Sequence, residues 1–135
     1  MVSFEGKPAF RVTDDVYLTQ KDVRQVQLAK GAVRAGIEAL LLSQNVRAED
    51  VDLVEIAGSF GYHLRAKSLI NIGLLPKEFE GKVSFVGNTS KSGGKAFLLN
   101  TDLRRYMEEL VGKIDSVELS NREGFDKIFV NALNF

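Results

Sequence analysis

Two apolar segments that each run into a glycine turn constrain the fold of this chain more than any other feature. In residues 54–61, an apolar stretch breaks into a turn that opens at Gly58 and closes at Gly61, and residues 83–88 repeat the pattern with Gly87. Glycine adopts positive φ and lets a ligand approach the backbone closely. A buried strand that ends in such a turn is a common place for an α/β protein to hold a nucleotide.

A long amphipathic helix is predicted ahead of these segments, over residues 20–43. Thr19 can cap this helix, and Asp22 stands where its side chain can return the bond. Apolar residues then recur at spacings that predict one helical stripe, namely Val23, Val26, Ala29, Val33, Ile37, Leu40 and Leu41. Gly31 and Gly36 interrupt the helix at ~1 kcal/mol each relative to alanine, so we expect another helix or a ligand to approach closely.

The rest of the chain alternates strands with helices, which predicts an α/β fold with parallel pairing in a single domain over residues 1–135. Strands are expected within 4–12 and over 51–57, 83–86 and 116–119, and helices over 64–72 and 96–112. Residues 125–135 are expected to form a terminal helix, or a helix followed by a tail. Residues 87–94 are expected to form a polar, glycine-rich loop. We expect the helix over 96–112 to break near Asn100.

Composition excludes several kinds of site and partner. Acidic and basic residues balance at 18 each and no basic stripe is present, so no nucleic-acid partner is expected. Without cysteine, this chain cannot hold a thiolate zinc site or a thiolate-bound iron–sulfur cluster, and the single histidine, His63, predicts no metal site. No apolar run reaches the ~18 residues of a membrane span. We therefore expect no membrane partner and a cytoplasmic location.

The loop after the second strand has the context of a phosphate loop but not its residues. Thr89 stands where the P-loop motif needs glycine, and Ala96 stands where it needs serine or threonine. Two interpretations remain open: a strand-to-helix turn whose small residues allow close packing, or a nucleotide-adjacent turn of another type.

The polar face of the long helix also has two interpretations. It carries Gln27, Lys30, Gly31, Arg34 and Glu38. These residues form either a solvated face with an Arg34–Glu38 pair or a face that meets a ligand. No residue pattern identifies a catalytic group.

Five segments in this order resemble one protein family. They are residues 18–32, 57–61, 72–76, 86–88 and 117–120, the last followed by Phe125 and Phe129. Together they resemble the C-terminal actin-like (ASKHA) ATPase lobe of the reductive activators of corrinoid proteins. The resemblance implies a ribonuclease-H-like lobe, with a mixed sheet flanked by helices. The family's ferredoxin-type and first-lobe regions have no counterpart in these residues.

The resemblance also implies a nucleotide site. Gly58, Ser59 and Phe60 would line the adenosine of ATP, and Gly87 and Asn88 would belong to the lobe junction. The helix residues that would face the adenosine are Gln27, Lys30, Gly31 and Arg34. Residues 89–95 are more polar and basic than the family pattern. The start of the helix that follows this loop is therefore expected to be looser than in the family, or to contact a different group.

The implied function is the adenosine-side lobe of an ATP-dependent activator that returns cobalt(II) corrinoid proteins to cobalt(I). Its partner would be a corrinoid protein or a corrinoid-dependent methyltransferase, and the iron–sulfur cluster would lie in the absent region. Because the phosphate-binding segments are also absent, the isolated chain is not expected to be catalytically competent. The alternative is a non-enzymatic module for protein interaction or homodimerisation derived from that lobe.

Overall fold

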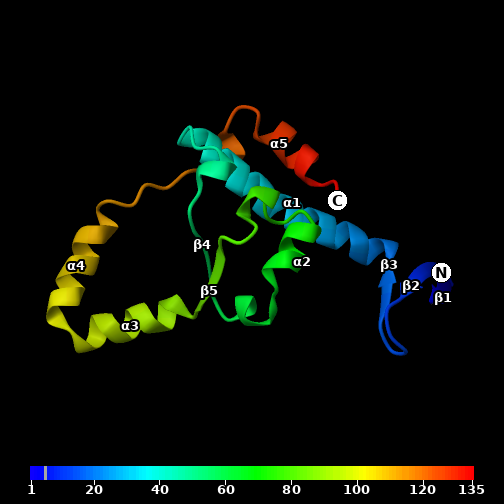
Figure 1. Cartoon of the computed structure of the whole chain (residues 1–135), viewed down its shortest axis with the longest axis horizontal. Coiled ribbons are helices and arrows are strands. Elements are labelled where there is room, and N and C mark those ends of the chain that lie inside the picture. The colour runs from blue at the N-terminus through cyan, green and yellow to red at the C-terminus, as the bar shows by residue number, and fades with distance from the viewer. Residues whose placement is uncertain (5) are drawn as a thin grey trace.

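The computed structural model describes residues 1–4 and 6–135, with the side chains of Phe60, Tyr62 and Ser120 outside the description. Its helices are α1 (Gln20–Ser43), α2 (Ala66–Asn71), α3 (Thr89–Leu99), α4 (Thr101–Val111) and α5 (Phe125–Ala132). Its strands are β1 (Val2–Phe4), β2 (Lys7–Arg11), β3 (Tyr17–Thr19), β4 (Val54–Ala57) and β5 (Val83–Gly87). In Figure 1, α5 returns to lie along the central helix α1, while α3 and α4 extend away from it.

The strands form two separate sheets. Strands β1, β2 and β3 are antiparallel, with Val2 opposite Ala9 and Ala9 opposite Thr19. Strands β4 and β5 are parallel, with Val54 opposite Val83 and an irregularity after Ile56. The predicted α/β class with sheets flanked by helices is confirmed, and its parallel and antiparallel pairings belong to different sheets.

Helix α1 has the predicted bounds because its first turn is capped on both sides. The Asp22 N–H donates to Thr19 Oγ1 at 3.3 Å, and the Thr19 N–H donates to Asp22 Oδ2 at 2.8 Å. This reciprocal arrangement satisfies backbone donors that the first turn of a helix otherwise leaves unpaired. The Thr19 side chain and backbone hydrogen bonds lower the pKa of Asp22.

We predict that Thr19→Ala destabilises the protein by about 1 kcal/mol near neutral pH, because it removes the side-chain cap. The folded-state pKa of Asp22 lies below its ordinary value of 3.8, so its stabilising contribution is present above that value and is lost as the pH falls through the folded pKa. The cost of Thr19→Ala should therefore shrink in acid. Urea denaturation of both proteins across this pH range measures it, and a cost that grows in acid would contradict the prediction.

The core lies between α1, α2 and the core-facing side of the β4–β5 sheet. Leu69, Leu75 and Phe79 are its buried centre. Partly buried apolar residues pack around them, namely Ile37, Leu41, Ala48, Val51, Val54, Ile56, Leu64, Ile70, Leu74 and Val83. This packing sets the position of β4 and β5, and hence of the glycine turns at their ends.

The predicted loop over residues 87–94 is wrong, because helix α3 already begins at Thr89. The Asn88 side chain accepts a hydrogen bond from the Lys91 N–H at 2.9 Å and so caps the helix. A cap of this kind stabilises a helix by about 1 kcal/mol, which offsets part of the unfavourable helix propensity of Gly93 and Gly94. The predicted break is confirmed, since Asn100 ends α3 and caps α4 through its side chain.

The strand predicted over residues 116–119 is also wrong. This segment has no strand partner among the described residues, and a short 3₁₀ turn follows at Leu119–Asn121. A β-strand is stabilised by its neighbours rather than by its own propensity. Of the described helices, none combines the length and apolar character needed to cross a bilayer.

Candidate functional site

The two glycine turns meet at the carboxyl ends of β4 and β5. The Gly58 N–H donates to the Gly87 carbonyl oxygen at 2.7 Å. Both glycines have positive φ, +103° at Gly58 and +70° at Gly87, and a Cβ added to either would meet no atom within 4 Å. Both glycines are half-buried, and the open space at their Cα atoms leaves room for a ligand at the edge of a parallel sheet where ligands commonly bind.

The N-terminus of α3 lies beside these turns, because Asn88 follows β5 directly. Its first turn presents backbone N–H groups and the positive end of the helix dipole, which favour an anion. Asn88 Oδ1 accepts the Lys91 N–H, and the Ser92 hydroxyl donates to the Asn88 carbonyl oxygen at 3.3 Å. The Lys91 side chain is exposed. This corner can receive a negatively charged group.

The first turn continues through Ser59 into a 3₁₀ helix, Phe60–His63. Ser59 is exposed, while the predicted contact of the Phe60 side chain lies outside the described residues. Gly61 is buried, and a Cβ there would lie 3.2 Å from Ile56 Cγ2 and 3.3 Å from Phe85 Cδ1. Close packing against the strands therefore accounts for this glycine.

The predicted helix-face residues form a different group, against the C-terminal segment Leu133–Phe135. Lys30 is only 2 % exposed, and its Nζ donates to the Asn134 carbonyl oxygen and lies 5.0 Å from the Phe135 ring centroid. Gln27 Nε2 donates to the Leu133 carbonyl oxygen at 3.3 Å. Burial, with a smaller effect of Arg34, lowers the pKa of Lys30. The C-terminal segment covers this part of α1.

Gly31 and Arg34 extend the same group along α1. A Cβ at Gly31 would lie 2.9 Å from Leu133 Cδ2 and 3.3 Å from the Ala132 carbonyl oxygen, so the expected close approach is made by α5 and the residues after it. Arg34 Nε pairs with Glu38 Oε1 at 2.6 Å. A pocket of about 200 Å³ adjoins this pair, lined by Arg34, Glu38, Gly73, Asn131, Ala132 and Asn134.

The predicted site residues therefore fall into two groups. Gly58, Ser59, Gly87 and Asn88 gather at the strand ends, and the α1 residues gather under the C-terminal segment. Within the described part of the chain, no hydrogen bond or ion pair connects the two groups. No motif in the sequence indicates Leu133, Asn134 and Phe135 as partners of α1. The one signal for them was the glycine at position 31, which predicted that something packs closely there.

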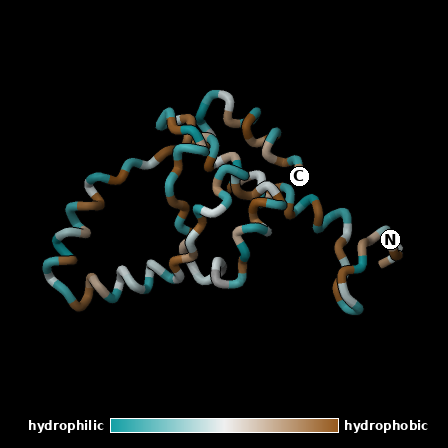
Figure 2. The backbone as a smooth tube through the Cα atoms, viewed as in Figure 1, coloured by the Kyte–Doolittle hydropathy of each residue, from teal (hydrophilic) through white to brown (hydrophobic). Residues whose placement is uncertain are grey.

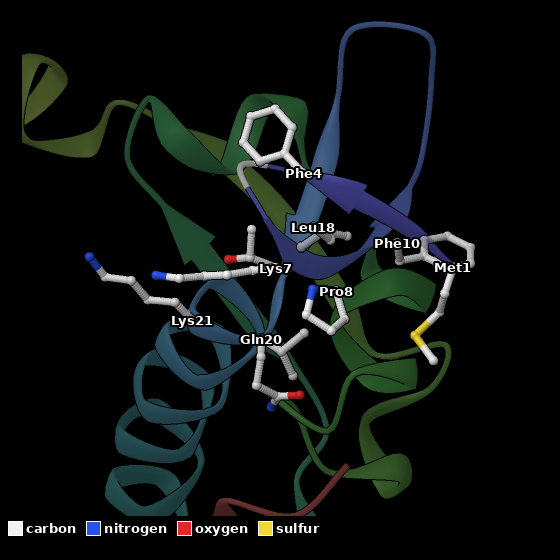
Figure 3. Close-up of a pocket in the computed structure, with 10 residues that line it drawn as sticks. Met1, Phe4, Lys7, Pro8, Phe10, Leu18, Gln20 and Lys21 are labelled. Carbon is white, nitrogen blue, oxygen red and sulfur yellow. The ribbon is translucent and has the colours of Figure 1, made fainter.

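A third region holds a pocket of about 650 Å³ between the N-terminal sheet and the start of α1. Figure 3 shows Phe4, Pro8, Phe10 and Leu18 among its mostly apolar lining. None of the predicted site residues lines it. In the described residues, no cluster of three or more histidine and acidic side chains could hold a metal ion.

Comparison with known proteins places this architecture in a family. The family model described as the C-terminal domain of RACo, the ASKHA domain, matches residues 4–135. The corrinoid activation enzyme RamQ of Eubacterium limosum is 40% identical over 90 residues, which cover 65% of this chain and 15% of RamQ. A [Co(II) methylated amine-specific corrinoid protein] reductase of Methanosarcina barkeri is 25% identical over 122 residues, covering 89% of this chain and 22% of the reductase.

A solved structure agrees with these matches. The reductive activator for corrinoid, iron–sulfur protein superimposes with a TM-score of 0.78 at 36% identity, over 87% of this chain and 19% of the activator. The chain thus spans less than a quarter of the length of each of these relatives. The strand-end glycine turns, the long capped helix and the matched residues lead to one conclusion: this chain belongs to the family of C-terminal ASKHA domains of the reductive activators of corrinoid proteins.

Proposed function

We propose that this chain is the adenosine-side lobe of an ATP-dependent activator that returns cobalt(II) corrinoid proteins to cobalt(I). The observation that carries the proposal is the hydrogen bond of Gly58 to Gly87, which joins two positive-φ turns beside the N-terminus of α3. The protein that this activator reduces is a corrinoid protein or a corrinoid-dependent methyltransferase. The iron–sulfur cluster belongs to a part of the activator outside these residues, because this chain has no cysteine.

The residues at the strand ends fit a nucleoside. Open space stands where Gly58 and Gly87 would carry a Cβ, so a flat base or a ribose can lie against the backbone. Ser59 adds an exposed hydroxyl, and the α3 N-terminus adds backbone donors for a negatively charged group. When bound, ATP would supply the free energy for the conformational change, and this lobe would hold the nucleoside end of it.

The residues of α1 fit this site only in part. Lys30 and Gln27 hydrogen-bond to the C-terminal segment, and Gly31 packs against it. We propose that these three residues and Arg34 face the nucleotide only when residues 133–135 are displaced from α1. Phe60 is proposed to contact the base because it directly follows Ser59 in the turn.

Gly58→Val tests the proposal, because it changes the backbone at the proposed contact. Valine is strained at a φ of +103°, and its side chain enters the space that the nucleoside would occupy. We predict that ADP and ATP bind at least about tenfold more weakly, which corresponds to about 1.4 kcal/mol. Isothermal titration calorimetry of the variant and the unmodified protein measures the difference.

Gly81→Val is the matched control. Gly81 has a φ of +78° and open space at its Cβ, as Gly58 does, but it lies in the turn before β5. The control suffers comparable backbone strain at the opposite end of the β4–β5 sheet and should leave nucleotide affinity unchanged. Equal nucleotide affinity of Gly58→Val and the unmodified protein would refute the assignment.

A second function is supported by the exposed apolar surface of α4, where Leu103, Tyr106 and Leu110 are all exposed. A lobe of this kind can act as a module for protein interaction without catalysis. Capture of a corrinoid protein by this chain with and without ATP distinguishes the two. Capture that depends on ATP supports the activator lobe, and capture that is independent of nucleotide supports the interaction module.

A further inference from the structure

The C-terminal segment covers a lysine whose charged group is removed from solvent. Lys30 is only 2% exposed, which is unusual because lysine is almost never fully buried without a partner. Among the described residues, no carboxylate pairs with its ammonium group. Lys30 Nζ instead donates to the Asn134 carbonyl oxygen and lies 5.0 Å from the Phe135 ring centroid, where the chain runs beside α1 (Figure 1). No ligand can reach this nitrogen in the present conformation.

The C-terminal segment offers α1 the same kinds of chemical group that a nucleoside offers. Gln27 Nε2 and Lys30 Nζ donate to consecutive backbone carbonyl oxygens, those of Leu133 and Asn134. A ribose hydroxyl accepts hydrogen bonds as a carbonyl oxygen does. The Phe135 ring lies over the ammonium group, and any flat aromatic ring can take this place. The segment therefore occupies the donors that would otherwise be free for a nucleoside.

The C-terminal segment is held less firmly than the helix before it. Ala132 is buried and α5 packs along α1, whereas Leu133 is half-buried, Asn134 is exposed and Phe135 is 65% exposed. Figure 2 shows hydrophobic residues alternating with hydrophilic ones along α5, which ends before this segment. A segment with few buried apolar contacts and no regular backbone ladder opens at a low cost in free energy. It can thus leave α1 while α5 stays in place.

A glycine turn lies on the other side of the buried lysine. Gly73 follows α2 with a φ of +73°, and a Cβ there would lie 3.3 Å from Lys30 Nζ and 3.8 Å from the Asn134 carbonyl oxygen. The pocket of about 200 Å³ beside Arg34 and Glu38 is lined by Gly73 and Asn134 as well. Because Asn134 lines this pocket and also covers Lys30, displacing the C-terminal segment opens the lysine toward the pocket.

We propose that the C-terminal segment is an autoinhibitory element, which occupies Lys30 and Gln27 in the absence of nucleotide and must leave α1 before a nucleoside can contact them. The inference rests on the proposed function, because it concerns the regulation of the nucleotide site. The segment and the nucleotide then exclude each other on α1. The apparent dissociation constant is that of the open form divided by the fraction of molecules that are open. Each contact that holds the segment down therefore weakens nucleotide binding.

Substitutions at Phe135 change how strongly the segment is held. Phe135→Ala removes the contact of the ring with Lys30 and should bind ADP about fivefold more tightly than the unmodified chain. Phe135→Trp should bind ADP about twofold more weakly, because tryptophan is the best of the aromatic rings at attracting a cation. Isothermal titration calorimetry measures both affinities. If the ring only supported the folded site, Phe135→Ala would bind ADP more weakly than the unmodified chain.

Phe10→Ala is the matched control. Phe10 is 62% exposed, close to the 65% of Phe135, but it lies on β2 in the N-terminal sheet. Its truncation should leave the ADP affinity unchanged. Thermal melts without nucleotide should show similar stabilities for Phe135→Ala and the unmodified chain, because a mostly exposed side chain contributes little to stability. A tighter affinity then cannot result from a more stable fold.

Asn134→Pro moves the segment without changing the Phe135 ring. Leu133 has a φ of −72° and a ψ of −25°, a helical conformation that is disfavoured in the residue before a proline. The substitution should turn the Leu133 carbonyl oxygen away from Gln27 and should also tighten ADP binding about fivefold. The two variants act on different contacts, so agreement between them would identify the segment as the cause.

Phe135→Trp also reports where the segment lies. The chain has no tryptophan, so all tryptophan emission of this variant comes from position 135. Saturating ADP should move the ring away from Lys30 and change this emission, with the same midpoint as the calorimetric titration. ADP binding without a change in emission would overturn the proposal.

The failure of this inference differs from the failure of the proposed function. If the unmodified chain binds ADP, and Phe135→Ala and Asn134→Pro bind it no more tightly, the segment is not autoinhibitory and the nucleotide site stands. Binding of ADP by these two variants, with none by the unmodified chain, would support a segment that closes the site fully. If no form of the chain binds ADP, both the inference and the proposed function are wrong.

Discussion

Replacing Phe79 with alanine is expected to lower the free energy of unfolding by about 3–5 kcal/mol. Phe79 is 3% exposed and forms the centre of the core with Leu69 and Leu75. Truncation removes most of the ring contacts and leaves a cavity that the surrounding residues fill only in part. A loss of this size is a large share of the ~5–15 kcal/mol that stabilises a typical domain.

Guanidinium denaturation of the unmodified protein and Phe79→Ala measures this loss. Phe10→Ala is the control, because Phe10 is 62% exposed on β2, and its truncation should change stability by no more than about 0.5 kcal/mol. The core assignment would fail if the two variants had similar stabilities. It would gain support if only Phe79→Ala shifted the midpoint strongly.

Replacing Gly31 with leucine is expected to destabilise the protein by about 2–3 kcal/mol, at the upper end of the range for overpacking. Even a Cβ at this position would lie 2.9 Å from Leu133 Cδ2 and 3.3 Å from the Ala132 carbonyl oxygen. The Leu133 side chain can move, but the backbone of α5 would have to shift as well. The substitution should therefore separate α5 from α1, and amide exchange over residues 125–132 should increase.

Gly36→Ala is the control in the same helix. A Cβ at Gly36 would lie 3.5 Å from Leu119 Cδ1, which is an ordinary contact, and alanine raises helix stability by about 1 kcal/mol. The two substitutions should thus change the midpoint of thermal unfolding in opposite directions. If Gly31→Leu left both the midpoint and the exchange of α5 unchanged, the packing of α5 on α1 would be refuted.

Local signals account for the elements that could be predicted from sequence. The bounds of α1 follow from Thr19, Asp22 and the apolar spacing, and the break at Asn100 follows from a polar residue that can end one helix and cap the next. The loop predicted over 87–94 was wrong because Asn88 caps a helix at this point, and the helix tolerates Gly93 and Gly94 in its interior. The strand over 116–119 was wrong because pairing depends on a neighbour that local sequence does not specify.

The candidate site could be predicted only in part. Gly58 and Gly87 were singled out by their place after apolar strands, and parallel pairing brings their turns into hydrogen-bond contact. Lys30 and Gln27 were recognised as a polar face, but their partners stand more than a hundred residues away in sequence. These distant segments are in contact because α5 packs on α1, and no motif near α1 predicts that packing.

The sequence by itself determined the α/β class, the long capped helix, the glycine turns and the order of segments that resembles the activator family. These features depend on backbone conformation and on periodicity, which act over a few neighbouring residues. Only the tertiary structure decided that the predicted site residues form two groups, that the C-terminal segment covers Lys30, and that α4 has an exposed apolar surface. The reason is that burial is a property of the whole chain, because it depends on which distant segments meet.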